Sequence, residues 1–385
     1  MNSQDERFSY RLEDYDYDLP EDLIALDPSP QRDESRLLVL HRSTGLMEHT
    51  IFRHIVNFLR PGDVLIMNDT KVVPARLYGR KETGGRVELL VLDPFADPEV
   101  AREKGYECLI KAAKPLKPGM KIKIVGPDDY GQVPPCRGKP PCPPSLTVVE
   151  VSQEGRARLL LPDGWDIMSL LHRYGEVPLP PYIRRSKSPG PADLERYQTV
   201  YAKHPGAVAA PTAGFHFTEK ILEEIRAMGV TVDFVTLHVG YGTFEPVKTE
   251  DVRHHKMHSE WCEIKRETAE LIKEAKQTGR RVIAVGTTVV RTLEGVVGII
   301  AGAVHEPPLP SMDVFSYRGF CDCYIVPGFQ FKIVDAMITN FHLPKSSLIL
   351  LVSAFAGREL ILAAYKEAIS RRYRFYSYGD AMFIV

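Results

Sequence analysis

Five short segments of the chain combine glycine or other small residues with hydroxyl, imidazole or carboxamide side chains. They span residues 68–71, 210–217, 238–244, 286–291 and 339–344. Small residues let the backbone approach a ligand closely, and these polar groups can then hydrogen-bond to it. Each segment alone could simply cap a helix or end a strand, but together they indicate a ligand-binding site. Gly286 opens a predicted helix, whose free N–H groups suit a carboxylate or a phosphate.

Histidines are concentrated before Glu260, at His254, His255 and His258. A zinc site needs three or four ligands with ordered partners behind them, and no HExxH pattern occurs here, so metal binding is the weakest interpretation. A general acid–base or hydrogen-bonding role for His258 or Glu260 and a purely structural role both remain open. We expect no metal site.

The cysteine spacings and several missing motifs limit the possible functions further. Cys321 and Cys323 are separated by one residue, which suits strand alternation better than chelation, and Cys136 and Cys142 give only a weak metal signal. The sequence has no Walker A or GxSxG pattern. Gly-Tyr-Gly at residues 240–242 does not open a helix, so a dinucleotide-binding loop is excluded there.

The segments that must position these residues change in character along the chain. Residues 72–161 predict six short strands punctuated by Gly and Pro, as in a small barrel or sandwich. From about residue 165 strands and helices alternate, which predicts a mainly parallel sheet. We therefore predict an α/β fold with an α/β catalytic domain at residues 1–69 and 162–385, and a β-barrel domain inserted at residues 70–161. Ligands bind at the carboxyl ends of parallel strands, where four of the five polar segments fall.

The composition is that of an ordinary globular protein without a strong charge bias. Of 385 residues, 44% are hydrophobic and 26% charged, and the net charge is −1. Any RNA contact must therefore come from local patches and be salt-sensitive. Two such patches are residues 184–187, with Arg184, Arg185 and Lys187, and residues 371–376, although an ordinary solvated surface is the alternative for each.

The start of the chain has neither the basic nor the apolar region of a signal peptide. No apolar run reaches the roughly 20 residues that span a bilayer. We expect a cytoplasmic protein that contacts no membrane.

Longer segments of the sequence resemble one known family. They are residues 17–20 (YDLP), 35–38 (SRLL), 68–77 (NDTKVVPARL), 197–202 (YQTVYA), 207–214 (AVAAPTAG), 255–260 and 339–344, with the motifs at Gly240 and Gly286. In this order and over nearly the whole chain, they resemble the S-adenosylmethionine:tRNA ribosyltransferase-isomerases of queuosine biosynthesis. The loop at residues 126–145 and the Cys-Asp-Cys segment at residues 321–323 depart from the family pattern without touching these motifs.

The resemblance implies an unusual use of S-adenosylmethionine, which is consumed as a substrate. Its ribosyl group, and not its methyl group, moves to 7-aminomethyl-7-deazaguanine at the wobble position of tRNA. The products are epoxyqueuosine-tRNA, adenine and methionine. The resemblance also implies an α/β domain combined with a small β-barrel, with S-adenosylmethionine and precursor-bearing tRNA as partners. Because the sulfonium makes the substrate electrophilic, we expect no further cofactor, and we expect a monomer.

This chemistry requires a base, an acid for the departing adenine and an enclosure poor in water. The base takes a C5′ hydrogen that the sulfonium has acidified. The candidates for proton transfer are His216, His238, His258, His342, Asp69 and Glu260. The candidates for substrate binding are Asn68, Thr70, Arg76, Thr212, Gly214, Gly240, Gly242, Thr243, Gly286, Thr287, Thr288, Arg291, Asn340 and Phe341. Of these, Thr287, Thr288 and Arg291 are placed to hold the methionine carboxylate, which a guanidinium can bind with two hydrogen bonds.

Two other functions remain as alternatives. An S-adenosylmethionine-dependent methyltransferase would release S-adenosylhomocysteine instead of adenine and methionine. A non-catalytic RNA-binding module would give no product from S-adenosylmethionine, and the nearly neutral charge counts against it. Tyr182, Tyr373 and Phe375, near the basic patches, could stack on unpaired bases or pack in the protein interior.

Overall fold

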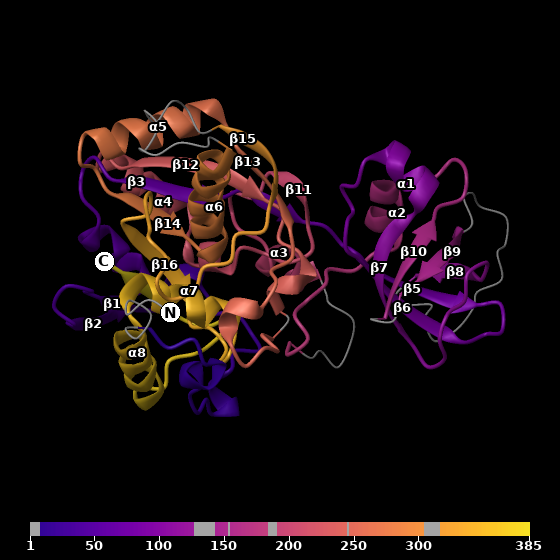
Figure 1. Cartoon of the computed structure of the whole chain (residues 1–385), viewed down its shortest axis with the longest axis horizontal. Coiled ribbons are helices and arrows are strands. Elements are labelled where there is room, and N and C mark those ends of the chain that lie inside the picture. The colour runs from indigo at the N-terminus through magenta and orange to yellow at the C-terminus, as the bar shows by residue number, and fades with distance from the viewer. Residues whose placement is uncertain (1–7, 127–142, 153–154, 184–190, 245, 304–315) are drawn as a thin grey trace. The chain divides into compact units, whose positions relative to one another are not determined.

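The computed structural model describes residues 8–126, 143–152, 155–183, 191–244, 246–303 and 316–385. The chain forms two compact units (Figure 1). The α/β unit comprises Met1–Thr70, Gln198–His204 and Pro211–Val385, and the barrel unit comprises Lys71–Tyr197 and Pro205–Ala210. The barrel unit is thus inserted into the α/β unit, and it includes residues 162–197, which the sequence-based boundary assigned to the α/β domain.

A mixed sheet is the centre of the α/β unit. Its order within the described residues is β15-β13-β12-β3-β14-β16-β17-β1-β2. The strands are β1 (Arg36–Leu40), β2 (Met47–Ile51), β3 (Val64–Asn68), β12 (Thr231–Leu237), β13 (Glu260–Ile264), β14 (Val282–Val285), β15 (Tyr317–Cys321), β16 (Ala336–Asn340) and β17 (Ala381–Ile384). The four adjacent strands β12, β3, β14 and β16 are parallel, as are β17 and β1, whereas the other four neighbouring pairs are antiparallel. The predicted α/β fold is confirmed, with its parallel strands in the middle of the sheet.

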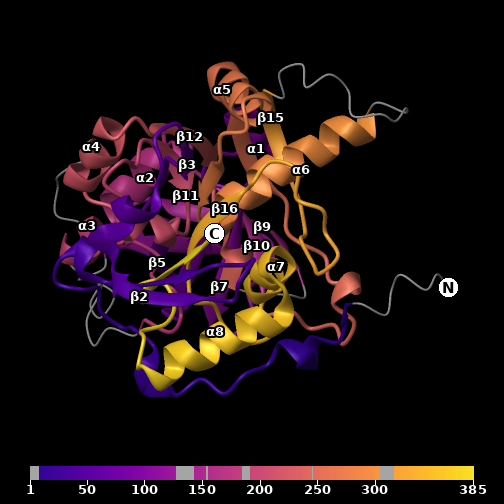
Figure 2. The same cartoon turned by 90° about the vertical axis from the view of Figure 1, so that its left-hand side faces the viewer.

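Helices cover both faces of this sheet (Figure 2). They are α4 (Glu219–Ala227), α5 (Arg266–Gln277), α6 (Thr287–Ala303), α7 (Ser347–Ala356) and α8 (Arg358–Ser370). On one face, apolar residues of α4 such as Ile221 and Ile225 pack on alternate strand residues such as Leu65 and Met67. Helix α6 contacts the four parallel strands from the other side. Side-chain caps fix the starts of α4 and α7, at Thr218 and Ser346.

The barrel unit contains a closed six-stranded antiparallel barrel, in the order β10-β7-β6-β5-β8-β9. Its strands are β5 (Arg76–Lys81), β6 (Arg86–Val91), β7 (Tyr106–Ala112), β8 (Lys121–Val125), β9 (Ser145–Val151) and β10 (Arg156–Leu160). The side chains alternate between the interior and the surface, so that in β8 Ile122 and Ile124 are buried while Lys121 and Lys123 are exposed. The predicted barrel is confirmed strand by strand.

The remaining elements are short. The barrel unit also holds α1 (Pro98–Lys104), α2 (Ile167–Tyr174) and α3 (Pro191–Arg196), and β4 (Thr70–Val72) pairs with β11 (His204–Ala207) in a separate two-stranded sheet. The 3-10 segments are Leu12–Tyr15, Glu21–Leu23, Arg32–Glu34, Phe52–Phe58, Thr212–His216, Tyr241–Phe244 and Val252–His254. Among the described residues no single helix is long and apolar enough to cross a membrane, although the sharply bent pair α7 and α8 would be by length and composition.

Candidate active site

Asn68, the last residue of β3, ties together the ends of two neighbouring elements. Its carboxamide oxygen accepts hydrogen bonds from the N–H groups of Leu237 (3.0 Å) and Thr70 (3.1 Å). Its nitrogen donates to the Leu237 carbonyl (3.0 Å) and lies 3.4 Å from the Thr288 hydroxyl. The side chain is completely buried. Asn68 therefore fixes the end of β12 and the start of α6, which is a positioning role.

His238 follows β12 and lies beside the same strand end. Its Nδ1 is 2.8 Å from the Thr70 hydroxyl, and its ring stacks on Trp261 with centroids 5.0 Å apart and planes 17° apart. Burial, with a smaller contribution from His204, lowers the pKa of His238 to about 4. The imidazole is therefore neutral at pH 7 and can accept a proton.

Asp69 directly follows β3 and also contacts β12. Its carboxylate accepts a hydrogen bond from the Thr236 hydroxyl (2.6 Å) and is 3.5 Å from Nε2 of His204. Only 5% of the residue is exposed. The structure thus places Asp69 and Thr70 at the carboxyl end of β3 and His238 at the carboxyl end of the neighbouring strand β12.

Glu260 and Arg291 form a buried ion pair next to Gly240. One carboxylate oxygen of Glu260 accepts from the Gly240 N–H (2.7 Å), and the other accepts from Nη1 of Arg291. Nε of Arg291 donates to the Cys323 carbonyl (3.0 Å), whereas its Nη2 is buried without a partner among the described residues. Burial disfavours the charged guanidinium, but Glu260 outweighs this effect and raises the pKa of Arg291. Nη1 of Arg291 is hydrogen-bonded to Glu260. Arg291 can therefore offer only Nη2, and not two nitrogens, to the carboxylate of a ligand.

The start of α6 lies at the carboxyl end of β14. Gly286 has φ +92°, a left-handed conformation that favours glycine, and its N–H donates to the Ile338 carbonyl (2.8 Å). Thr287 and Thr288 then begin a 17-residue helix, and both are 7% exposed. Thr287 and Arg291 are four residues apart, so they lie on the same face of the helix.

The end of β16 contacts two further buried histidines: His342, which follows the strand, and His216, from the 3-10 segment Thr212–His216. The Thr339 hydroxyl is 2.7 Å from Nε2 of His342. Asn340 accepts from the Thr212 hydroxyl (2.8 Å), and its nitrogen is 3.2 Å from Nε2 of His216. Burial lowers the pKa of both His216 and His342 to about 3. Since Nδ1 of His216 is also 2.6 Å from the Ser35 hydroxyl, both ring nitrogens of His216 are engaged within the protein.

Glycines permit two of the close approaches at this edge. A Cβ atom on Gly214 would lie 1.9 Å from the Tyr201 hydroxyl oxygen, and one on Gly242 would lie 2.3 Å from Cδ2 of His258. His258 itself is exposed. The side chain of Thr243 lies outside what the structure describes.

Two predicted substrate-binding residues, Phe341 and Arg76, contact other groups of the protein. Phe341 is fully buried, 5.4 Å from the Tyr365 ring and 5.1 Å from the Phe375 ring, which is a packing position. Arg76 belongs to the barrel unit, where it donates to the Leu179 carbonyl (3.1 Å) and pairs with Glu88 (3.3 Å).

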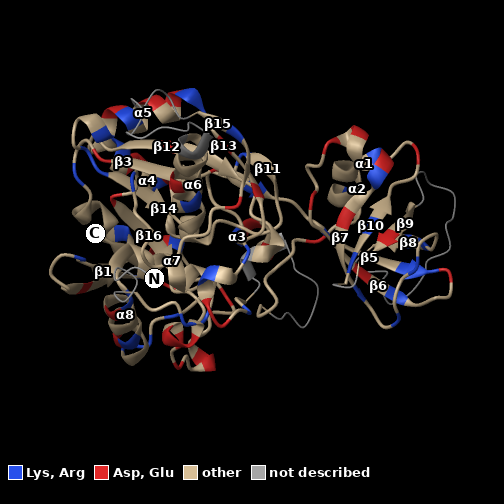
Figure 3. Ribbon diagram, in the orientation of Figure 1, with Lys and Arg blue, Asp and Glu red and all other residues tan. Residues whose placement is uncertain are grey.

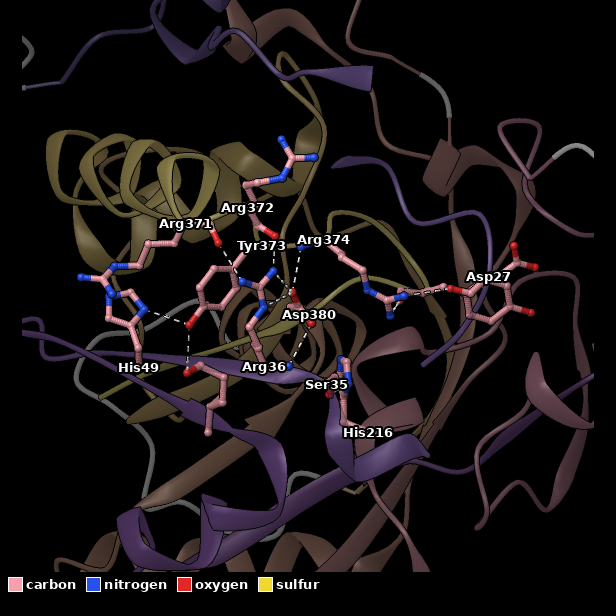
Figure 4. A network of polar contacts seen from close by, with 12 residues as sticks. Asp27, Ser35, Arg36, His49, His216, Arg371, Arg372, Tyr373, Arg374 and Asp380 are labelled. Carbon is pink, nitrogen blue, oxygen red and sulfur yellow. Dashed lines mark hydrogen bonds and ion pairs between the residues drawn. The ribbon is translucent and has the colours of Figure 1, made fainter. Parts of the chain in front are cut away.

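The basic segment 371–376 is part of the fold (Figure 4). The sequence analysis expected Tyr373 and Phe375 either to stack on unpaired bases or to pack in the interior. Both are buried, so they pack in the interior and the base-stacking prediction is wrong for them. Arg36 donates to the Arg371 carbonyl (2.8 Å), and the Asp380 carboxylate accepts from Arg36 Nε (3.1 Å) and from the Arg374 N–H (2.8 Å). Tyr182 is half-buried. Arg184, Arg185 and Lys187 lie outside the described residues, as do Cys136 and Cys142.

The sequence analysis did not identify Glu294, which binds the segment that leads into β16. This buried residue of α6 accepts hydrogen bonds from the N–H groups of Lys332, Ile333 and Val334, each at 2.9 Å. It thereby holds the segment that leads into β16. The signal that could have revealed it is that residues 289–301 contain a single acid, with Arg291 and Thr292 as the other polar residues of that stretch. Within the described ranges no group of three or more His, Cys, Asp or Glu is arranged to hold a metal ion.

Comparisons of the whole chain with known proteins all point to one family. The family model described as "Queuosine biosynthesis protein" matches residues 12–384. The S-adenosylmethionine:tRNA ribosyltransferase-isomerase of Halothermothrix orenii is 45% identical, over 97% of this chain and 100% of that protein. The protein of the same name from Aquifex aeolicus is 47% identical, with the same coverage. The crystal structure of the S-adenosylmethionine tRNA ribosyltransferase from Thermotoga maritima is similar with a TM-score of 0.50 and 34% identity, over 97% of this chain and 100% of that one.

Proposed function

Because the chain belongs to the queuosine biosynthesis family, we propose that it is a ribosyltransferase-isomerase acting on S-adenosylmethionine and tRNA. It transfers and isomerises the ribosyl group of S-adenosylmethionine onto 7-aminomethyl-7-deazaguanine at the tRNA wobble position. The products are epoxyqueuosine-tRNA, adenine and methionine. The enzyme uses no cofactor besides this substrate and acts as a monomer in the cytoplasm.

The observation that carries the site assignment is the buried guanidinium of Arg291. Its Nη2 is buried and has no hydrogen-bond partner among the described residues. Such a donor lowers the stability of a protein by about 1–3 kcal/mol, and a charged donor lowers it further. On the same helix face, Thr287 stands at the N-terminus of α6, where the helix dipole favours an anion. The methionine carboxylate of S-adenosylmethionine supplies the missing acceptor for Nη2 and the negative charge for the helix end.

His238 is the proposed base. It is neutral at pH 7, as His216 and His342 are, and its Nδ1 is hydrogen-bonded to Thr70, which follows Asp69 in the chain. It takes the C5′ proton next to the sulfonium, adenine departs and gains a proton on the released nitrogen, and the aminomethyl nitrogen of the tRNA base attacks the ribosyl fragment and loses a proton. Ring closure to the epoxide then expels methionine. His216 and His342 hold the end of β16 in place.

One reaction tests the proposal directly. The protein is incubated with S-adenosylmethionine and tRNA that carries the precursor base, and the digested nucleosides are weighed by mass spectrometry. We expect epoxyqueuosine in the tRNA, with adenine and methionine in equal amounts. S-adenosylhomocysteine with a methylated nucleoside would instead identify a methyltransferase, and tRNA binding without any small-molecule product would identify a binding module.

Size-exclusion chromatography with light scattering measures the molar mass in solution and so tests whether the protein is a monomer.

A further inference from the structure

Three of the six cysteines of the chain lie together beside helix α6. Cys262 is in the middle of β13, and Cys321 ends β15, which pairs with β13 at one edge of the sheet within the described residues. Cys323 follows two residues later, and all three are free thiols. A Cβ atom on Gly295 would lie 2.5 Å from Sγ of Cys321 and 2.6 Å from Cβ of Cys323, so both residues pack on bare backbone of α6. We call Cys262, Cys321 and Cys323 the thiol cluster.

A pocket gives small molecules access to the thiol cluster. It has a volume of about 450 Å³, and both Cys321 and Cys323 line it. Asp322 and Gly298 line it as well, and both are exposed, so the pocket is reached from solvent. A water molecule takes up about 30 Å³ in the liquid, so a molecule slightly larger than water, such as hydrogen peroxide, fits easily.

Cys321 is the thiol of the cluster that forms a thiolate most readily. A hydrogen bond from the Cys262 thiol lowers the pKa of Cys321 to about 7, although burial opposes this effect. The same hydrogen bond raises the pKa of Cys262, and burial raises the pKa of Cys323 to about 12. Because the thiolate is the nucleophile, Cys321 is the sulfur that reacts with an electrophile in the pocket.

The guanidinium of Arg291 also favours a thiolate at Cys321. Helix α6 has only Arg291 and Glu294 as charged residues, whereas α5 is charged along its length (Figure 3). Arg291 is thus the one cation that α6 presents to the thiol cluster.

Two hydrogen bonds connect Arg291 to the thiol cluster. In its protonated form, Sγ of Cys321 donates to the Arg291 carbonyl (3.7 Å). Nε of Arg291 donates to the Cys323 carbonyl (3.0 Å). A chemical change at Cys321 therefore acts on the residue whose guanidinium lies in the candidate active site.

We propose that Cys321 is a site of reversible oxidation by hydrogen peroxide, and that Cys262 then forms a disulfide with it. The Cys321 thiolate attacks one peroxide oxygen, so that an S–O bond forms, the O–O bond breaks and hydroxide leaves. This hydroxide takes the proton of Cys262, whose sulfur attacks the sulfenic acid. An S–S bond forms, the S–O bond breaks, and the second hydroxide takes up the proton that Cys321 had released. Two thiols and one peroxide thus become one disulfide and two waters.

The disulfide requires a shift of the edge strand β15. Cys262 is opposite Gly319 and Cys321 is opposite Glu260, so the two cysteines are diagonal neighbours. Diagonal neighbours usually have Cα atoms about 7–8 Å apart, whereas disulfide-bonded cysteines usually have them about 4.4–6.8 Å apart. The end of β15 must therefore move toward β13 when the bond forms. This movement loosens the two hydrogen bonds that connect the thiol cluster to Arg291.

Peptide mapping of the full chain tests the oxidation site. The protein is treated with a low molar excess of hydrogen peroxide, the remaining thiols are blocked with N-ethylmaleimide, and mass spectrometry identifies the linked peptides. We expect a Cys262–Cys321 link in the wild type and in Cys323→Ser, and none in Cys321→Ser. Cys323→Ser is the matched control, because Cys323 lines the same pocket two residues away.

A trapping experiment identifies the sulfur that peroxide attacks. In Cys262→Ser the sulfenic acid cannot be resolved by Cys262, so dimedone should label Cys321. Absence of the Cys262–Cys321 link from the wild type would overturn the proposal however the variants fold. Dimedone on Cys323 in place of Cys321 would also overturn it.

The enzyme assay tests the effect on Arg291, and this part of the inference rests on the proposed function. Adenine release is measured against S-adenosylmethionine concentration for untreated, oxidised and dithiothreitol-reduced protein. We expect oxidation to raise KM for S-adenosylmethionine about fivefold or more and dithiothreitol to restore it. Cys321→Ser exposed to the same peroxide should keep its KM.

The two measurements separate this inference from the proposed function. If the disulfide forms and KM stays the same, the effect on Arg291 is wrong. If the untreated wild type releases no adenine, the proposed function fails, yet peptide mapping still decides whether Cys321 is the oxidation site.

Discussion

The guanidinium of Arg291 and the carboxylate of Glu260 are both removed from solvent, so each needs the other. Replacing one member of a buried pair leaves a charge without compensation, which costs about 3–5 kcal/mol. We predict that Arg291→Met lowers the free energy of unfolding by about this amount and that adding Glu260→Gln restores part of it. Urea denaturation of the wild type, the two single variants and the double variant measures the coupling. Additive losses would show that the pair is not energetically linked.

His238 and His216 should respond to mutation in different ways. His238→Gln keeps a hydrogen-bonding side chain beside Thr70 but removes the base, so kcat should fall about 10²–10⁴-fold with little change in Tm. His216→Gln disturbs the contacts to Ser35 and Asn340, so it should lower Tm, with a smaller effect on kcat at temperatures where the protein stays folded. Wild-type turnover in the His238 variant would place proton transfer elsewhere.

Buried neutral histidines also make stability depend on pH. The pKa values of His216 and His342 are about 3 in the folded protein and about 6.5 when unfolded, so the unfolded chain binds more protons in between. Stability is therefore complete above pH 6.5 and is lost as the pH falls toward 3. Each histidine should cost about 2 kcal/mol between pH 7 and pH 5. Unfolding free energies of wild type and His216→Asn at both pH values check this, and the variant should show the smaller loss.

From the sequence it was possible to predict which residues are chemically suited to the site, but not which residues they contact. Asn68, Thr70 and His238 were selected because of residue type and position after strands, and the structure places them in contact. Their hydrogen bonds join segments about 170 residues apart, which no local pattern encodes. Phe341 shows the converse, since its position beside polar residues gave no sign that it faces an aromatic core.

At the level of elements, Glu294 links α6 to the segment before β16. Glu294→Ala leaves three N–H groups without their acceptor and should lower the free energy of unfolding by about 3 kcal/mol. Glu223→Ala, on the exposed side of α4, is the matched control and should stay within about 0.5 kcal/mol. Chemical denaturation measures both, and equal effects would mean that Glu294 does not hold this segment.

Local periodicity was enough for many elements. The barrel strands follow alternating residues with Gly and Pro between them, and α6 begins directly after Gly286, as predicted. Helix α8 was missed, because it starts directly after Gly357 with no loop to mark it. The antiparallel pairing of β17 with β16 was also not foreseen, since pairing across a sheet depends on contacts between segments remote in sequence.

For the whole molecule, the two units have separate apolar interiors. Leu65 belongs to the core beneath α4, whereas Leu89 is buried inside the barrel. We predict two calorimetric transitions, of which Leu65→Ala lowers one and Leu89→Ala lowers the other, each by several degrees for a loss of about 2–5 kcal/mol. A single transition that moves with both variants would show that the units unfold together.

The place of β17 in the sheet sets the order in which the protein can fold during translation. β17 lies between β16 and β1, and it pairs with β1 from more than 340 residues further along the chain. At about 5–20 residues per second, the ribosome needs roughly 20–70 s after making β1 to deliver this partner. The barrel strands are contiguous and emerge within that interval, so the barrel can mature first. Until then the edge of β1 that β17 later covers stays unpaired, and an unpaired apolar strand edge favours aggregation.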